Sequence, residues 1–156
     1  MEAKELMIGD WVQNPYGYKA QVKNIRWIPK DKCDDEGGYY LIDIARGESF
    51  LARLEEKDIE PIPLTSELLE ANGFERVPQP GCANPYHWML EKYEEPAAVL
   101  LFRIKAFNTP FRGIFVSIDN PSACETISFY KQIEFVHELQ HALQLCEIEL
   151  ELKLED

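Results

Sequence analysis

The sequence predicts an α+β fold built from two parts, and three observations carry this prediction. Apolar and polar side chains alternate with a period of two over the first sixty residues, which is typical of strands. A proline-rich segment at 59–63 then interrupts this pattern. Close to the C-terminus the apolar spacing changes to the period of a helix. We therefore expect two domains, residues 1–62 and 63–156.

In the first domain, short strands are expected at 11–13, 18–28 and 39–44. The breaks between them carry turn residues, and 31–38 has the acidic, glycine-containing composition of a hairpin tip. Several short, twisted strands within sixty residues indicate an SH3-like small β-barrel. Pro61 and Pro63 would end this unit, since a proline cannot donate a ladder hydrogen bond inside a sheet.

In the second domain, a short helix is expected at 66–71, with Thr65 as its N-cap and Asn72-Gly73 as its stop. Three strands at 87–93, 98–106 and 113–118 would then form a small antiparallel sheet. Helical spacing over 128–146 predicts one long C-terminal helix. The alternation over 148–154 predicts a final edge strand.

Length and composition set limits on the class of protein. The chain has 156 residues, of which 46% are hydrophobic, so a core of useful size is expected. The net charge of −12 argues against a general nucleic-acid binder or an anionic-membrane binder, because phosphate recognition needs clustered Lys and Arg. The charge therefore disfavours nucleic-acid binding, and we expect the protein not to bind membranes.

The cysteines and the hydropathy pattern predict a cytoplasmic protein. No apolar run approaches the roughly 18 residues that span a bilayer, and residues 1–5 lack the build of a signal peptide. The four cysteines are far apart and are expected to be free thiols. They are Cys33, Cys82, Cys124 and Cys146.

The sequence His137-Glu138-Leu139-Gln140-His141 matches the H-E-x-x-H motif of zinc hydrolases. On a helix the two histidines would share a face and hold zinc, while Glu138 would activate the bound water. This gives one alternative function, a zinc-dependent hydrolase. Its third ligand would be Glu147, six residues after His141.

Two arguments favour a helix without metal or catalytic role at this motif. The apolar stripe of the predicted helix leaves both histidines on the opposite, solvent-facing side. Gln144 also replaces the glycine that lets the chain turn before the third ligand of the extended motif. Upstream donors are limited to Cys82 and His87, and nothing in the sequence places them near the pair. We therefore predict no catalytic residue, no metal site and no cofactor, with zinc as the alternative.

Four aromatic side chains of the first domain are the candidate binding residues. They are Trp11, Tyr16, Tyr18 and Trp27. The competing interpretation is that they form the aromatic core of a small barrel. Basic residues lie among them, which gives a second alternative, a nucleic-acid-binding accessory protein. These are Lys19, Lys23, Arg26, Lys30 and Lys32.

Three segments together resemble a family of small uncharacterised proteins from anaerobic gut bacteria and their phages and mobile elements. The segments are 5–12, 59–65 together with 67–74, and 135–141. The resemblance implies no activity, because none is assigned to that family. It also implies a C-terminal helix that often carries Gln or Asn at the positions of Glu138 or His141, which disfavours peptidase chemistry.

Taken together, these observations predict a non-enzymatic accessory or interaction protein. An SH3-like barrel and an open sheet edge both recognise extended peptides, so we expect a protein or peptide partner.

Overall fold

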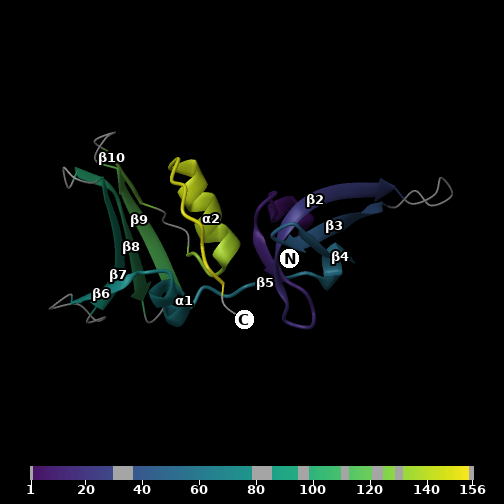
Figure 1. Ribbon diagram of the computed structural model, residues 1–156, viewed down its shortest axis with the longest axis horizontal. Coiled ribbons are helices and arrows are strands. Elements are labelled where there is room, and N and C mark those ends of the chain that lie inside the picture. Colours follow the sequence, from purple (N-terminus) through teal and green to yellow (C-terminus); the bar gives the residue numbers. More distant parts are fainter. Residues whose placement is uncertain are drawn as a thin grey trace. The chain divides into compact units, whose positions relative to one another are not determined.

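The computed structural model describes residues 2–29, 37–78, 86–94, 99–109, 113–120, 125–128 and 132–154. The chain divides into two compact units, unit 1 (Met1–Ile62) and unit 2 (Pro63–Glu155). Each unit contains one five-stranded antiparallel sheet (Figure 1). In the described ranges, no helix has the length and apolar character needed to cross a membrane.

The prediction of an α+β fold with an SH3-like barrel and one long C-terminal helix is wrong. The protein is mostly β, and neither sheet closes into a barrel. In unit 1 the edge strands are β4 (Ser49–Glu55) and β5 (Glu60–Pro61), and they do not pair with each other. β5 is only two residues long and ends at Pro61, the first proline of 59–63, so it adds a short edge and does not complete a ring.

Unit 1 is built around a long β2–β3 hairpin. Its sheet order is β4-β3-β2-β1-β5, and two 3₁₀ turns accompany it. The remaining elements are β1 (Trp11–Gln13), β2 (Lys19–Pro29), β3 (Gly38–Arg46), η1 (Ala3–Glu5) and η2 (Glu56–Asp58).

The core of unit 1 lies on one face of this sheet, called here its inner face. Val12, Val22, Ile42 and Ile44 are completely buried there, because alternate residues of a strand point to the same side. Ala3 and Leu6, from η1 and its end, and Ile59, just after η2, complete this core. The turn η1 together with Leu6 and Ile59 therefore provides the cover that a helix provides in many small domains, since no residue of η2 itself is buried.

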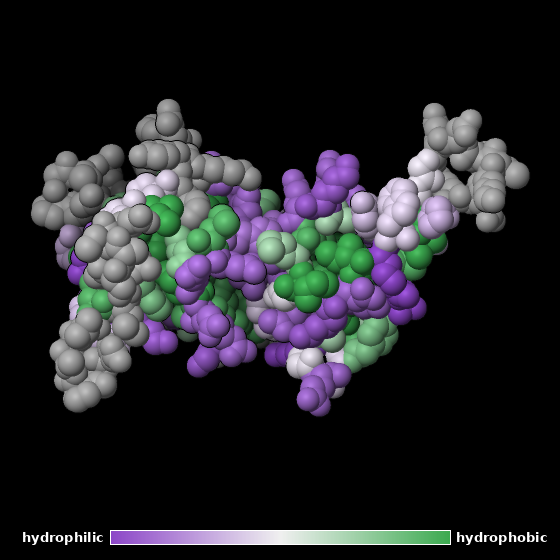
Figure 2. Space-filling view, turned by 90° about the horizontal axis from the view of Figure 1, so that it is seen from above, coloured by the Kyte–Doolittle hydropathy of each residue, from purple (hydrophilic) through white to green (hydrophobic). Residues whose placement is uncertain are grey.

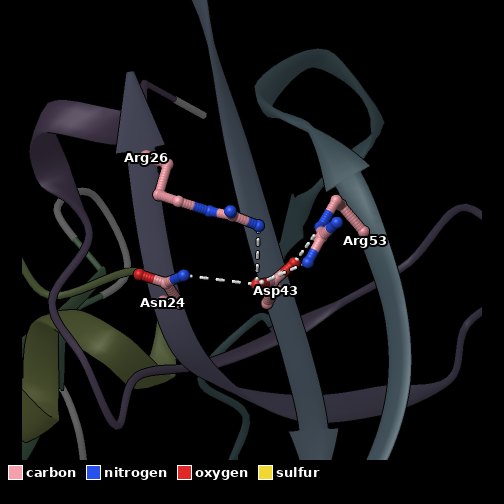
Figure 3. Close-up of polar contacts among 4 residues, drawn as sticks. All are labelled: Asn24, Arg26, Asp43 and Arg53. Atoms are coloured by element: carbon pink, nitrogen blue, oxygen red, sulfur yellow. Dashed lines mark hydrogen bonds and ion pairs between the residues drawn. The ribbon is translucent and has the colours of Figure 1, made fainter. Parts of the chain in front are cut away.

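The outer face of the same sheet carries an ion cluster centred on Asp43 of β3 (Figure 3). Its carboxylate accepts hydrogen bonds from Arg53 Nε at 2.5 Å, Arg26 Nη2 at 3.2 Å and Asn24 Nδ2 at 3.3 Å. Asn24 and Arg53 are the direct cross-strand neighbours of Asp43 on β2 and β4. The Arg53 guanidinium holds the pKa of Asp43 below its ordinary value, so the cluster stays ionised at neutral pH.

Unit 2 forms a meander in the order β10-β9-β8-β7-β6, and its described residues include two helices. The strands are β6 (Glu75–Pro78), β7 (Tyr86–Glu94), β8 (Val99–Thr109), β9 (Gly113–Asn120) and β10 (Glu125–Ser128). The helices are α1 (Ser66–Ala71) and α2 (Val136–Leu145).

The inner face of the unit 2 sheet packs a β-branched and aromatic core. Trp88, Ile104 and Val116 are buried on three neighbouring strands, and α2 lies beside this sheet in Figure 1. Leu139 and Leu143 of α2 are also buried, as the predicted apolar stripe requires. Alternate residues such as His87 then belong to the opposite, outer face.

The predicted helix 66–71 is confirmed, including its caps. Thr65 Oγ1 accepts a hydrogen bond from the Leu68 N–H, and Gly73 has a φ of 83° just beyond the helix end. The predicted helix 128–146 is wrong in length, because α2 begins only at Val136. Residue 128 lies in β10, and an isolated bridge pairs Ile133 with Ile114.

The predicted edge strand at 148–154 is also wrong. The segment is not part of either sheet, although Ile148, Leu152 and Leu154 are buried. Its backbone is held by the Asn72 side chain, whose Nδ2 donates to the Lys153 carbonyl and whose Oδ1 accepts from the Lys153 N–H. An amide side chain therefore takes the place of a partner strand.

Candidate functional site

A hollow of about 480 Å³ lies in unit 1, and we call it the aromatic hollow. It is lined by Glu2, Lys4, Trp27, Gly38, Tyr40 and Glu56. Trp27 of β2 and Tyr40 of β3 are direct cross-strand neighbours. They lie two residues beyond the core pair Ile25 and Ile42, on the same face of the sheet. The hollow therefore lies on the inner face of the sheet, next to the part that η1, Leu6 and Ile59 cover.

Two aromatic rings, of Trp27 and Tyr40, line the hollow. Their centroids are 4.9 Å apart and their planes are tilted by 60°. Trp27 keeps 51% of its surface exposed, whereas Tyr40 is half-buried. An indole that is half open to solvent, yet fixed by a neighbouring ring, presents a preformed apolar surface to a ligand.

Gly38 is the reason that the indole can lie in this place. A Cβ on Gly38 would lie 2.5 Å from the Trp27 ring and 2.2 Å from the Ile28 carbonyl oxygen. Only a residue without a side chain fits under the ring at this distance. The local packing therefore specifies the position of Trp27.

Charged residues from the two 3₁₀ turns border the hollow. Glu2 and Lys4 flank or belong to η1, and Glu56 is the first residue of η2. Because Leu41 pairs with Glu55, Glu56 follows beside Tyr40. Two carboxylates and one ammonium thus line the same hollow as the two aromatic rings.

The four predicted binding residues do not form one surface. Tyr16 and Tyr18 are 85% and 62% exposed, in the turn between β1 and β2, where Asn14 Oδ1 accepts from both of their N–H groups. Trp27 lies at the far end of β2, and at about 3.3 Å per residue this end is roughly 30 Å from Tyr18. Trp11 is half-buried and pairs with Gln21. Of the four, only Trp27 lines the hollow.

Gly38, Tyr40, Glu2 and Glu56 are not among the predicted site residues. The segment Gly37-Gly38-Tyr39-Tyr40 has the aromatic composition of a strand next to a glycine, and pairing it with β2 opposite Trp27 would have found the hollow. Glu2 and Glu56 give no comparable signal, because they are ordinary acidic residues in an acidic chain.

The prediction that both motif histidines face solvent is wrong for His137. This residue is only 4% exposed, and its ring stacks on Phe135 with a centroid distance of 5.8 Å and an interplanar angle of 8°. The His141 ring approaches it edge-on at 5.8 Å. The helix begins at Val136, so His137 lies in its first turn, next to the N-cap residue Phe135.

Glu138 serves as a cap of α2 in this structure. Its Oε2 accepts hydrogen bonds from the Glu134 N–H at 2.7 Å and the Phe135 N–H at 3.2 Å. These are backbone donors that precede the helix and would otherwise be unsatisfied. The carboxylate that a zinc hydrolase would use as a base is engaged in holding the helix start.

No three His, Cys, Asp or Glu side chains gather at one point among the residues that the structure describes. Glu147 follows the end of α2 with a φ of 56° and is exposed. His87 lies on the outer face of the unit 2 sheet, whereas α2 lies on the inner side. Cys82 falls outside the described residues, as do Cys33 and Cys124, and Cys146 is a buried free thiol whose pKa is raised by burial.

Two of the basic residues considered for nucleic-acid binding have polar partners in the described part of the chain. Arg26 is paired with Asp43, and the Lys23 ammonium donates to Gln21 Oε1. Lys30 and Lys32 lie outside the described residues. A phosphate-binding surface would require cations that carboxylates do not already neutralise.

Comparisons with protein families, with curated proteins and with solved structures give no match for this chain. The candidate site must therefore be interpreted from its own chemistry.

Proposed function

We propose that this chain is a non-enzymatic interaction protein whose unit 1 binds a protein or peptide partner in the aromatic hollow. The observation that carries the proposal is Trp27, a large side chain that remains half-exposed although Gly38 and Tyr40 hold it in one position. Rigid, partly exposed aromatic side chains are enriched among the residues that dominate binding energy.

The shape of unit 1 supports a peptide as the ligand. The hollow of about 480 Å³ accommodates one or two side chains. The β4 edge also carries exposed Phe50 and Leu51 (63% and 41%). Figure 2 shows that green hydrophobic residues lie at the surface of the protein among purple hydrophilic ones. An open strand edge pairs with extended backbone, and an adjacent pocket then selects a side chain.

The geometry described above favours this proposal over the two alternatives. A zinc hydrolase needs a third ligand and a carboxylate available to water, whereas Glu138 caps α2. A nucleic-acid binder needs unpaired cations, whereas Arg26 is held by Asp43.

The proposal is tested by selecting binders from a random peptide display library on the full-length protein. We expect enriched peptides that bind the wild type and lose at least about tenfold in affinity for Trp27→Ala, as for a central aromatic contact. Tyr16→Ala is the matched control, since Tyr16 is an exposed aromatic at the other end of the sheet.

Two results would contradict the proposal. One is the absence of any enriched peptide after repeated selection, and the other is a set of peptides that bind wild type and Trp27→Ala equally well. Peptides lost with Tyr16→Ala would move the site to the β1–β2 turn.

A further inference from the structure

We infer that the side chain received by the aromatic hollow is an arginine, presented by an extended basic peptide. This inference rests on the proposed function and names the chemistry of its ligand. It follows from the combination of ring faces, charges and space at this position in unit 1.

The first step concerns the rings. A cation over the face of an aromatic ring is attracted by the ring's negative π-surface, and Trp is the best such partner. Trp27 lines the hollow with half of its surface open, and Tyr40 adds a second ring at 60° to the first. A neutral apolar side chain would gain only burial there, while a cation would also gain this electrostatic attraction.

The second step concerns the charges on the border. Glu2 and Glu56 contribute two carboxylates and Lys4 one ammonium, so the border carries a net negative charge. The whole chain carries −12, which attracts a basic partner before contact. An acidic peptide would be repelled both at long range and at the hollow.

The third step selects arginine over lysine. A guanidinium is planar, so it can stack on an indole while its N–H groups donate sideways to a carboxylate. It is also less strongly hydrated than an ammonium, which lowers the cost of leaving water. The hollow offers this combination of a flat ring and nearby carboxylates.

The test uses the full-length protein and an acetylated, amidated pentapeptide, Gly-Gly-Arg-Gly-Gly. The comparison peptides carry citrulline, which has the same shape without the charge, or lysine at the central position. Titration is followed by the indole N–H signals in NMR spectra, since the chain has three tryptophans. We expect the arginine peptide to bind about tenfold more tightly than the citrulline peptide, with the lysine peptide between them.

The border residues provide variants with opposite expected signs. Glu2→Gln combined with Glu56→Gln should weaken the arginine peptide about 3- to 10-fold, because it removes both carboxylates. Lys4→Gln should strengthen it about 2- to 3-fold, because it removes the like charge. Trp27→Ala should abolish binding, and Tyr16→Ala should leave it unchanged.

Equal binding of the arginine and citrulline peptides would overturn the inference. If both then depended on Trp27, the proposed function would still stand. Tighter binding of lysine than of arginine, or no binding of the arginine peptide at several millimolar, would also overturn it, while the display experiment judges the peptide-binding function separately.

Discussion

Trp27 and Trp88 occupy comparable places in two similar sheets, but their surroundings are opposite. Each lies on the inner face of a five-stranded antiparallel sheet, next to a cross-strand partner. Trp88 is 2% exposed, and its Nε1 donates to Glu70 Oε1 at 3.1 Å. Trp27 is 51% exposed and rests on Gly38 and Tyr40.

The difference shows that the elements packed on a sheet determine whether an aromatic residue of its inner face is buried or exposed. Unit 2 contains α1 and the ten-residue α2. Unit 1 covers its inner face with Ala3 of the three-residue turn η1, Leu6 and Ile59, whereas no residue of η2 is buried. Its sheet is longer than this cover, so the row of Trp27 and Tyr40 lies partly open. We interpret Trp88 as a core residue and Trp27 as a binding residue.

The largest effect expected from this comparison is that of Trp88→Ala. Removing a fully buried indole leaves a cavity and removes one of the two hydrogen bonds that Glu70 Oε1 accepts, the other coming from Arg76, so the free energy of unfolding of unit 2 should fall by about 3–5 kcal/mol. Chemical denaturation followed by circular dichroism measures the loss. Trp27→Ala is the matched control and should cost about 1 kcal/mol, because half of that side chain is already in water.

A comparable loss of stability in both variants would break the comparison. It would mean that Trp27 is a core residue and that its exposure does not mark a binding surface.

Local chemistry accounts for the parts of the fold that sequence reasoning predicted. The helix 66–71 is specified by Thr65 and Asn72-Gly73, whose capping interactions involve only neighbouring residues. Strand alternation likewise placed the strands that contain Trp11, Trp27 and Trp88. These features depend on spacing along the chain, which the sequence displays directly.

The errors concern interactions between distant residues. Whether a sheet closes depends on pairing of its edges, and nothing local distinguishes an open meander from a barrel. The alternation at 148–154 was interpreted as a strand, but Asn72 holds that backbone from 81 residues away. The aromatic hollow was missed for the same reason, since Gly38 and Tyr40 meet Trp27 only through the register of β2 and β3.

Gly38→Ala tests whether the position of Trp27 is specified by packing. The new Cβ would overlap the Ile28 carbonyl oxygen and the indole ring, so backbone and ring must both move. We expect a loss of about 2 kcal/mol in the stability of unit 1, together with loss of the peptides selected on the wild type. Gly47→Ala provides a control for glycine replacement in unit 1, since nothing lies within 4 Å of its Cβ position, although its φ of 60° adds some backbone strain. Unchanged peptide binding by Gly38→Ala would show that the ring is not held by this contact.

Glu138→Ala addresses the helix that closes unit 2. Removing the Glu138 carboxylate leaves the N–H groups of Glu134 and Phe135 without this acceptor, and we expect a loss of about 1 kcal/mol. Thermal unfolding measures it. Glu138→Gln, which keeps an acceptor oxygen, should lose less, and Gln144→Ala on the exposed side of α2 should be near neutral. A stable Glu138→Ala variant would contradict the capping role and reopen the catalytic interpretation of the motif.

The smallest expected effect concerns His87 on the outer face of the unit 2 sheet. Its ring stacks on Phe107 at 5.1 Å, and both ring nitrogens are buried without a hydrogen-bond partner. Burial, and secondly the charge of Lys105, lowers the pKa of His87. The unfolded chain therefore binds a proton at a higher pH than the folded chain does, and the stability present at pH 7 is lost as the pH falls below about 6.5.

His87→Phe keeps the ring stack and removes this titration. We expect the melting temperature of the wild type, relative to that of the variant, to fall by about 2 °C between pH 7 and pH 5.5. Lys105→Gln should reduce the decrease, because it removes the second cause of the pKa shift. If the difference in melting temperature between wild type and His87→Phe does not change with pH, the imidazole binds a proton equally well in the folded and the unfolded chain. His87 would then be as accessible to water as the ion cluster on the outer face of the unit 1 sheet. The two sheets would differ only on their inner faces, where Trp27 is exposed and Trp88 is buried.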